Sequence, residues 1–308
     1  MQNPMLGTEF ELLEHTEPQL FPGERTSSPM RVLVLGAGVS GIEAARVLAG
    51  RGHQVEIWER ANRPGGQMHL AIAAPDKLEV EPVWSYRWAE VSALGVVVRM
   101  GVDADAAAIK AFAPDHVVIA TGASPRPAPI DVSALSKSIR VCHAWDALAD
   151  STLVPQGAKV TIVGGGMVGV ETADLLVTRG CAITIVEMLE GVALGMARNN
   201  RMELIDRLAE AGVVTLLSSR IQGARDESLE IAAKDGSLKA LPIGDVLIFA
   251  NGPKPNREAV AVVESAGVSY SLVGDCAQPG DFLTGIRDAW MVGLGVERIT
   301  RGASTGMK

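Results

Sequence analysis

Two short glycine-rich motifs have the residue spacing that binds phosphate groups. Each follows the pattern Gly-x-Gly-x-x-Gly, formed by Gly36, Gly38 and Gly41 in the first copy and by Gly164, Gly166 and Gly169 in the second. In such a motif the first glycine permits a tight turn, the second leaves room for a pyrophosphate, and the third lets a helix pack closely. The amino terminus of that helix directs backbone N–H groups toward the phosphates. The two motifs therefore predict dinucleotide binding.

A carboxylate follows each motif at the same distance. Glu59 and Glu187 each lie 23 positions after the first glycine of their motif, at the end of an aliphatic run. A carboxylate in this place accepts hydrogen bonds from the hydroxyls of an adenosine ribose. It would also repel a 2′-phosphate. Where the ligand is a nicotinamide nucleotide, these residues favour NAD over NADP.

The elements that position these residues form an internal repeat. Residues Arg31–Arg60 align without gaps on Lys159–Met188 at an offset of 128. Each copy has an aliphatic strand, a glycine turn, a helical stretch ended by a glycine, and a second aliphatic strand. Such a β-α-β unit folds with a right-handed crossover and parallel strands. The sequence therefore predicts an α/β fold with two Rossmann-like domains, each a parallel sheet with helices on both faces.

The remaining segments predict elements around the two units. Helices are expected at Asp76–Leu94, Asp103–Phe112, Arg198–Gly212 and from the last strand to about Arg298. Strands are expected at Val96–Met100, His116–Ala120, Asp245–Ala250 and Ser269–Val273, and a hairpin at Ser228–Leu241. Three prolines, Pro125, Pro127 and Pro129, mark a boundary, after which a loosely structured connector is expected at 126–157.

Composition excludes several classes of protein. A hydrophobic fraction of 47% excludes wholesale disorder, while a net charge of −8 without a Lys/Arg block argues against nucleic-acid binding. Neither a signal peptide nor an apolar run of the roughly 18 residues needed for a membrane helix is present, so no membrane insertion is expected. The three cysteines lack the CxxC spacing of a redox dithiol or a metal site and favour a reducing, cytoplasmic setting.

Several motifs in a fixed order resemble one family. They are Gly36–Gly41, Pro64-Gly-Gly-Gln67, Ile119-Ala-Thr-Gly-Ala123, Gly164–Glu171, Gly252-Pro-Lys-Pro-Asn256 and Val273-Gly-Asp-Cys276. Together they resemble the flavoproteins with two dinucleotide-binding domains. Over nearly the whole chain the similarity is to the C-terminal half of the 2,4-dienoyl-CoA reductase, enoate reductase and trimethylamine dehydrogenase group. Ala250-Asn251-Gly252 departs mildly from the family pattern at the corresponding turn.

The resemblance implies two sets of cofactor-binding residues. The set for FAD is Gly36, Gly38, Val39, Ser40, Gly41, Glu59, Arg60, Gly65, Gly66, Gln67, Ala120, Thr121, Gly122, Gly274 and Asp275. The set for NAD(H) is Gly164, Gly166, Met167, Val168, Gly169, Glu171, Glu187 and Gly252. Asp275 would bind a ribityl hydroxyl, and the helix after it would direct its amino terminus at the flavin. No catalytic acid or base and no metal ligand is implied.

Other residues have simpler interpretations. Glu43 and Glu171, each two residues after a third glycine, could be polar helix residues, and only Glu171 is carried forward as a cofactor contact. Cys142 and His143 would point apart if they lie on a strand, which argues against a catalytic pair. Met188 and Met196 are expected to fill the core.

The resemblance also implies how the chain is organised and with what it works. We expect an acidic extended segment at 1–29, an FAD domain at 30–125 and 251–308, and an inserted NAD(P) domain at 126–250. Members of the group carry an FMN-binding barrel and an iron–sulfur cluster, and this chain resembles the part that follows them. The expected role is electron transfer between NAD(H) and flavin beside a separate FMN/iron–sulfur barrel subunit acting on an enoate, enoyl or amine substrate. A stand-alone NADH:acceptor reductase and a non-catalytic ADP-binding module remain alternatives.

Overall fold

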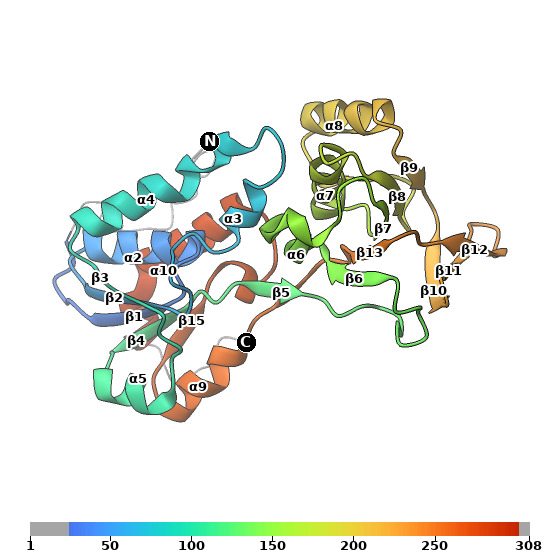
Figure 1. The fold of residues 1–308 in the computed structure, drawn as a ribbon. Helices are drawn as coiled ribbons and strands as arrows, with labels where there is room; N and C mark the ends of the chain where they lie inside the picture. The colour runs from blue at the N-terminus through green and yellow to red at the C-terminus, as the bar shows by residue number, and fades with distance from the viewer. Residues whose placement is uncertain (1–24, 302–308) are drawn as a thin grey trace. The chain divides into compact units, whose positions relative to one another are not determined.

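The chain folds into two compact units, seen here in a computed structural model that describes residues 25–301 and side chains up to residue 297 (Figure 1). The first unit comprises residues 25–68, 80–124 and 255–301, and the second comprises 69–79 and 125–254. The chain passes between them within β5 (Ala123–Pro125) and β14 (Pro253–Pro255), which pair as a two-stranded sheet. Most of the acidic segment predicted at 1–29 lies outside the described residues.

The first unit contains a five-stranded parallel sheet in the order β15-β4-β1-β2-β3. Its strands are β1 (Arg31–Leu35), β2 (Gln54–Glu59), β3 (Val97–Met100), β4 (His116–Ile119) and β15 (Tyr270–Leu272). Its helices are α2 (Val39–Gly50), α4 (Pro82–Ala93), α5 (Ala106–Phe112), α9 (Glu258–Ala266) and α10 (Phe282–Arg301). A short helix, α3 (Met68–Ala71), begins on the last residue of one segment of this unit and continues into a segment of the second unit. The parallel order places every strand's carboxyl end at one edge of the sheet.

Both faces of this sheet are buried. On β1, Val32 and Val34 pack in one core with residues of α2, α4 and α10, whereas Leu33 and Leu35 pack in another with residues of α5 and α9. Alternate residues of a strand point to opposite faces, so a strand covered on both sides reads as a continuous aliphatic run. The burial of β1 therefore explains the sequence of its last four residues.

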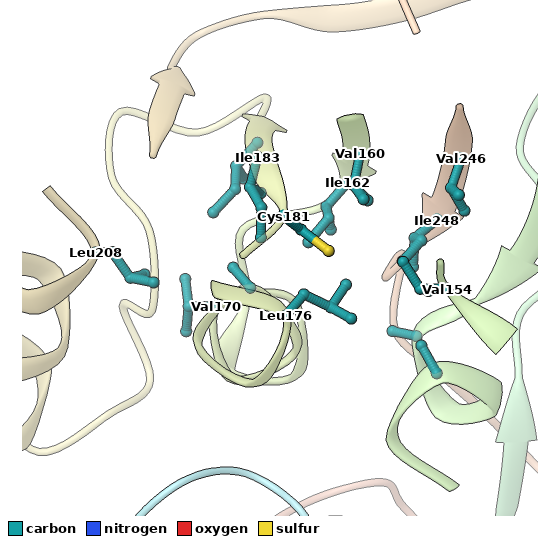
Figure 2. Packing of buried hydrophobic residues seen from close by; sticks show 14 of the residues in the cluster. Val154, Val160, Ile162, Val170, Leu176, Cys181, Ile183, Leu208, Val246 and Ile248 are labelled. Carbon is teal, nitrogen blue, oxygen red and sulfur yellow. The ribbon is translucent and has the colours of Figure 1, made fainter. Parts of the chain in front are cut away.

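The second unit repeats the same sheet in the order β6-β13-β7-β8-β9. Its strands are β6 (Arg140–His143), β7 (Lys159–Val163), β8 (Ala182–Val186), β9 (Val214–Leu216) and β13 (Val246–Phe249). Helices α6 (Ala144–Ala149), α7 (Met167–Val177) and α8 (Arg198–Glu210) contribute to the core on one face. Figure 2 shows that core, with Ile162 and Ile248 of the sheet facing Val170 and Leu176 of α7.

The other face of the second sheet carries strands in place of the expected helices. An antiparallel sheet of β10 (Arg220–Arg225), β11 (Ser228–Ala232) and β12 (Leu238–Pro242) covers it. Leu229 and Ile231 of β11 pack there in one cluster with Leu247 and Phe249 of β13. The hairpin predicted at Ser228–Leu241 is present as β11 and β12, and β10 adds a third strand.

Two expectations about individual segments were wrong. The connector at 126–157 is not loosely structured throughout, because β6 pairs along its whole length with β13 and is followed by α6. The helix predicted at Asp76–Leu94 begins only at Pro82. Asp76 has a φ of 57°, a left-handed conformation that an α-helix does not contain, and proline favours the first turn.

Residues 69–79 belong with the second unit, although the sequence places them between elements of the first. Two ion pairs join this segment to helices of the second unit. Lys77 Nζ lies 3.1 Å from a carboxylate oxygen of Glu171 on α7, and Asp76 lies 3.8 Å from Arg207 on α8. Such pairs are tertiary contacts that no local sequence pattern reports.

Candidate dinucleotide-binding sites

The first glycine loop joins β1 to α2 with no room for side chains at two of its glycines. Gly36 has a φ of +108°, and a Cβ on it would lie 2.4 Å from the carbonyl oxygen of Ala120. A Cβ on Gly41 would lie 2.0 Å from the carbonyl oxygen of Gly36. A Cβ on Gly38 would meet nothing within 4 Å. The first and third glycines are therefore required by packing, and the second faces open space that a phosphate could fill.

The second glycine loop, between β7 and α7, has the same geometry. Gly164 has a φ of +111°, and a Cβ on it would lie 2.4 Å from the carbonyl oxygen of Ala250. A Cβ on Gly169 would lie 2.0 Å from the carbonyl oxygen of Gly164, while one on Gly166 would meet nothing within 4 Å. Both cradles thus fit a pyrophosphate by the same test.

Helix starts complete each cradle. The helices α2 and α7 begin directly after the second glycine, so the predicted pairs Val39–Ser40 and Met167–Val168 form their first turns. Neither helix has a side-chain cap at its amino terminus. Uncapped N–H groups of a first turn are donors for an anion.

The two predicted ribose carboxylates are held in matching ways. The Glu59 carboxylate accepts hydrogen bonds from the backbone N–H groups of Ala37 and Ala61 at 2.6 and 2.7 Å. The Glu187 carboxylate accepts from the N–H groups of Gly165 and Leu189 at 2.6 and 2.7 Å. Two donors fix each carboxylate beside its glycine loop, at the carboxyl end of β2 or directly after β8.

The segment Pro64–Gln67, called the strap below, follows β2 and covers the first glycine loop. The N–H of Gly65 donates to the carbonyl oxygen of Ala37 at 2.8 Å, and Gly65 forms a β-bridge with Gly38. A Cβ on Gly66 would lie 3.1 Å from the Cα of Gly38, and one on Gly122 would lie 3.1 Å from the side-chain amide nitrogen of Gln67. The structure thus brings together Gly38, Gly66, Gln67 and the turn after β4.

The predicted Gly274-Asp275 turn also reaches the first loop. A Cβ on Gly274 would lie 2.3 Å from the Ser40 hydroxyl oxygen, so the turn after β15 packs directly on the start of α2. The Asp275 carboxylate accepts a hydrogen bond from the Gly280 N–H at 3.1 Å. At the other turn, the Thr121 hydroxyl donates to the carbonyl oxygen of Asn256 at 2.7 Å. The residues predicted for the first site therefore converge from five segments of one unit.

Some predicted residues lie apart from these cradles or have other partners. Arg60 is exposed, Glu171 is paired with Lys77, and Gly252 lies in the turn after β13 with a φ of +92°. Asn251, the departure from the family pattern, donates through its side-chain amide to the carbonyl oxygen of Pro127 at 2.8 Å. The expectation that Met188 fills the core was wrong, since its side chain is 55% exposed beside the second site.

One element of the second site was missed by sequence reasoning. The N–H of Ala193 donates to the carbonyl oxygen of Gly165 at 2.7 Å, as that of Gly65 does to Ala37. Ala193 lies 128 positions after Gly65, which is also the spacing of the glycine loops. An alignment continued past Glu187 could have found this second strap, although Ala193 and Leu194 stand where the first strap has Gly65 and Gly66.

Two of the three cysteines lie in surroundings that disfavour the reactive thiolate. Burial raises the pKa of Cys142 to about 11 and also raises the pKa of Cys276, whose Sγ lies 3.0 Å from the carbonyl oxygen of Ile119. Thiols with raised pKa values are poor nucleophiles. Among residues 25–301 no group of His, Cys, Asp or Glu side chains could hold a metal ion. Within the same range no helix combines the length and apolar character needed to cross a membrane.

Comparisons with known proteins agree with this geometry. Residues 30–276 match the family described as pyridine nucleotide-disulphide oxidoreductase. The bilirubin reductase of Mediterraneibacter gnavus is 37% identical over 257 residues, covering 82% of this chain and 39% of the relative. The NADH oxidase of Thermoanaerobacter brockii is 32% identical over 268 residues, covering 85% of this chain and 41% of the relative. The chain thus spans about 40% of the length of these curated relatives.

Solved structures show the same fold. A 2-naphthoyl-CoA reductase in complex with 2-naphthoyl-CoA superposes with a TM-score of 0.81 at 28% identity, covering 95% of this chain and 42% of that one. A histamine dehydrogenase from Rhizobium sp. 4-9 superposes with a TM-score of 0.79 at 21% identity, covering 89% of this chain and 45% of that one. The α/β class with Rossmann-like sheets and the resemblance to two-domain flavoproteins are confirmed.

Members of the matched family are flavin-dependent oxidoreductases that use FAD with NAD(P)H, and the cradles described above have the form that such cofactors need. The family match covers the strands, glycine loops and carboxylates of both copies. The chain belongs to the pyridine nucleotide-disulphide oxidoreductase family.

Proposed function

We propose that the first unit binds FAD, that the second binds NAD(H), and that the chain transfers electrons between them. The observation that carries this proposal is the duplicated cradle in one chain, with Gly38 and Gly166 facing open space and Glu59 and Glu187 each fixed by two backbone donors. Side chains alone carry redox steps poorly, so a protein with two such cradles supplies binding and orientation while the cofactors supply the redox chemistry.

The first unit supports the assignment of FAD through the segments that converge on its loop. The residues proposed to hold FAD are Gly36, Gly38, Val39, Ser40, Gly41, Glu59, Arg60, Gly66, Gln67, Ala120, Thr121, Gly122, Gly274 and Asp275. A long nucleotide needs contacts from several strand ends, and the strap and the Gly274 turn supply them here. The start of α10 is capped by Asp281, which accepts from the Thr284 N–H at 2.8 Å. The backbone N–H groups of Phe282 and Leu283, in the same first turn, also favour a negative charge near that end of the helix.

The second unit supports a nicotinamide nucleotide without a 2′-phosphate. The residues proposed to hold it are Gly164, Gly166, Met167, Val168, Gly169, Glu171, Glu187 and Gly252. Glu187 would repel a 2′-phosphate, and the residues after it are Met188 and Leu189, whose side chains are 55% and 48% exposed. Neither side chain carries a charge or a donor that could pair with a phosphate, so NAD(H) is favoured over NADP(H).

We propose that the reaction on the final substrate takes place on a partner and not in either of these two units. Neither cradle contains a side chain placed as a substrate acid or base, and this chain corresponds to only part of its relatives. We therefore propose a partner that carries an FMN-binding barrel and an iron–sulfur cluster and acts on an enoate, enoyl or amine substrate. The partner's chemistry is inferred from the family resemblance.

The decisive experiment is spectroscopic. The purified chain, reconstituted with FAD, is expected to show flavin absorbance at one FAD per chain and to be bleached by NADH under anaerobic conditions faster than by NADPH. Absence of flavin after reconstitution would contradict the proposal. Faster bleaching by NADPH would contradict only the preference for NADH that is assigned to Glu187.

A second candidate function is supported by the similarity to an NADH oxidase. In that case the chain would act alone as an NADH:acceptor reductase with a quinone, a dye or oxygen. Sustained NADH oxidation by the isolated chain would favour this role. Rapid bleaching followed by slow reoxidation would favour the role with a partner.

A further inference from the structure

The helix that follows each glycine loop carries a glutamate at the same position. Glu43 and Glu171 are 128 positions apart, and each lies two residues after the third glycine of its motif. Both are near the amino-terminal end of the helix whose first turn faces the proposed diphosphate. Two negative charges at short range repel one another, so an unpaired carboxylate here would weaken the binding of an anionic ligand.

The first unit neutralises this carboxylate with its own repeat and a neighbouring helix. Glu43 is fully buried and accepts hydrogen bonds from the Arg46 guanidinium at 2.8 and 2.9 Å. It also accepts from Arg87 of α4 at 2.9 Å. Two arginines therefore surround one carboxylate at the first site.

The second unit lacks the corresponding cation within its repeat. The residue 128 positions after Arg46 is Asp174, an acid whose carboxylate is bound by Arg207 at 2.6 and 2.8 Å. Glu171 is instead paired with Lys77, whose Nζ lies 3.1 Å from its carboxylate oxygen. The two side chains are 16% and 27% exposed, so the pair is partly shielded from solvent.

The backbone before Lys77 is held in a defined conformation. Ala74 is buried, and Asp76 adopts a left-handed φ of 57°. A non-glycine residue in that region persists only where its surroundings impose it. Asp76, whose side chain is 86% exposed, also lies 3.8 Å from Arg207 on α8. Lys77 therefore follows a buried residue and a left-handed turn, and its side chain reaches Glu171.

We propose that Lys77 is a positioning residue of the second dinucleotide site, which offsets the charge of Glu171 and so permits an anionic diphosphate to bind. This inference rests on the proposed function, since it concerns the nucleotide assigned there. Lys77 would act through Glu171. The charge effect is directed at the diphosphate, which NADH and ADP-ribose have in common.

The test measures nucleotide affinity in three variants. Lys77→Met removes the cation, Lys77→Met with Glu171→Gln removes both charges, and Lys110→Met removes an exposed cation on α5 of the first unit as a control for net charge. Dissociation constants for NADH and ADP-ribose are measured by calorimetry at low and at moderate salt on FAD-loaded protein. FAD content and the thermal midpoint of each variant report on folding.

Lys77→Met is expected to weaken both ligands about fivefold at low salt, because a partly exposed charge pair is worth about 1 kcal/mol. The loss should shrink at moderate salt, where exposed charges are screened. The double variant should bind ADP-ribose more tightly than Lys77→Met does, since no carboxylate is left uncompensated. Lys110→Met should leave both affinities unchanged.

Three outcomes would overturn the proposal. They are an unchanged affinity in Lys77→Met, a double variant as weak as Lys77→Met, and a loss confined to NADH. The second would mean that Lys77 contacts the nucleotide itself, and the third would place its effect at the nicotinamide. The wild-type chain is measured first. If it binds FAD but neither NADH nor ADP-ribose, the proposed function of the second unit fails before any variant is compared.

Discussion

The straps of the two units make the same backbone contact with different residues. Gly65 in the first unit and Ala193 in the second each donate to the carbonyl oxygen of the second residue of the glycine motif, at 2.8 and 2.7 Å. The next residue differs. Gly66 allows the backbone to approach Gly38 closely, whereas Leu194 is 59% exposed. The duplication therefore kept the path of the strap and changed how closely it covers the loop.

This difference matches the roles proposed for the two nucleotides. A loop covered by a close strap favours a nucleotide that stays bound, because release requires the strap to move. A loop whose strap carries the exposed Leu194 where the first strap has Gly66 favours a nucleotide that enters and leaves. We infer that the first site retains its cofactor and that the second exchanges its ligand, and the following predictions test the two sites against each other.

The largest effects are expected from the first glycine of each loop. Gly36→Ala and Gly164→Ala each place a Cβ about 2.4 Å from a carbonyl oxygen at a φ above +100°. Each clash should destabilise its own unit by at least about 2 kcal/mol and abolish its own ligand. Gly36→Ala should lose FAD and keep NADH binding, and Gly164→Ala should do the reverse. Absorbance of bound flavin and calorimetry with NADH measure the two outcomes.

A control for this pair uses the second glycines. Gly38→Ala and Gly166→Ala meet no protein atom, so folding should be retained while the added methyl group occupies space assigned to phosphate. Loss of thermal stability without loss of the ligand would contradict the assignment of these glycines to phosphate binding.

Lowering the pH should reduce the stability of the first unit before that of the second. Burial lowers the pKa of His116, the first residue of β4, to about 4 from its ordinary value of 6.5. Its ring nitrogens lie 2.9 and 3.0 Å from the hydroxyls of Ser269 and Ser271 near and in β15. The corresponding residue of the second sheet is Val246, since His116 pairs with Val32 and Val246 with Val160. Only the first sheet carries a titrating group at this position.

The direction of the effect follows from proton linkage. Between pH 4 and 6.5 the unfolded chain binds a proton at this histidine that the folded chain excludes, so the free energy of unfolding falls as the pH falls through that window. The stability lost approaches about 3 kcal/mol below pH 4. Urea denaturation from pH 7 to pH 4, compared with His116→Val, measures it. Equal pH slopes in the two proteins would rule out this histidine as the cause.

Removal of the second ribose carboxylate should cost less. Glu187→Ala deletes the carboxylate proposed to accept from two ribose hydroxyls and frees two backbone donors, so NADH binding should weaken by roughly tenfold or more. NADPH binding should weaken less, because the repulsion of its 2′-phosphate is removed as well. Glu59→Ala is the matched control, in which FAD retention falls and the affinity for NADH is unchanged. An unaltered ratio of NADH to NADPH affinity would argue against the role of Glu187.

Features encoded in the local repeat, such as the glycine motifs, could be predicted from the sequence. Features that depend on tertiary contact, such as the strand β6, could not. Glycines that no other residue could replace, such as Gly36 and Gly164, are recognisable because their requirement is written in a six-residue motif. The strand β6 is four residues long, and Arg140 and Val141 within it are exposed, so it has no buried alternation to detect. Its identity as a strand comes from pairing with β13.

Lys77 and Met188 were missed or misjudged for related reasons. The partner of Lys77 lies 94 positions away on a helix of the second copy of the repeat, and a lysine within a predicted helix carries no signal of its own. Met188 follows a buried strand and was assigned to the core, yet it is exposed beside a proposed ligand site. Apolar residues near a ligand site resemble core residues in sequence, because a ligand surface and a core surface need the same side chains.

The smallest effect concerns the straps and tests whether both need a left-handed residue. Ala193 is buried and has a φ of 51°, a conformation that costs an L-residue roughly 1–2 kcal/mol relative to glycine. Glycine gains backbone entropy in the unfolded chain and loses the buried methyl group, so Ala193→Gly should change stability by less than about 1 kcal/mol in either direction. Gly65 has a φ of 102°, outside the region that alanine tolerates, so Gly65→Ala should cost more than Ala193→Gly. Thermal midpoints of the two variants, with FAD and NADH added in turn, measure the difference. If Gly65→Ala were the milder change, close coverage of the first loop would not depend on the backbone freedom of its strap, and the contrast between a retaining and an exchanging site would have to rest on the residue after it.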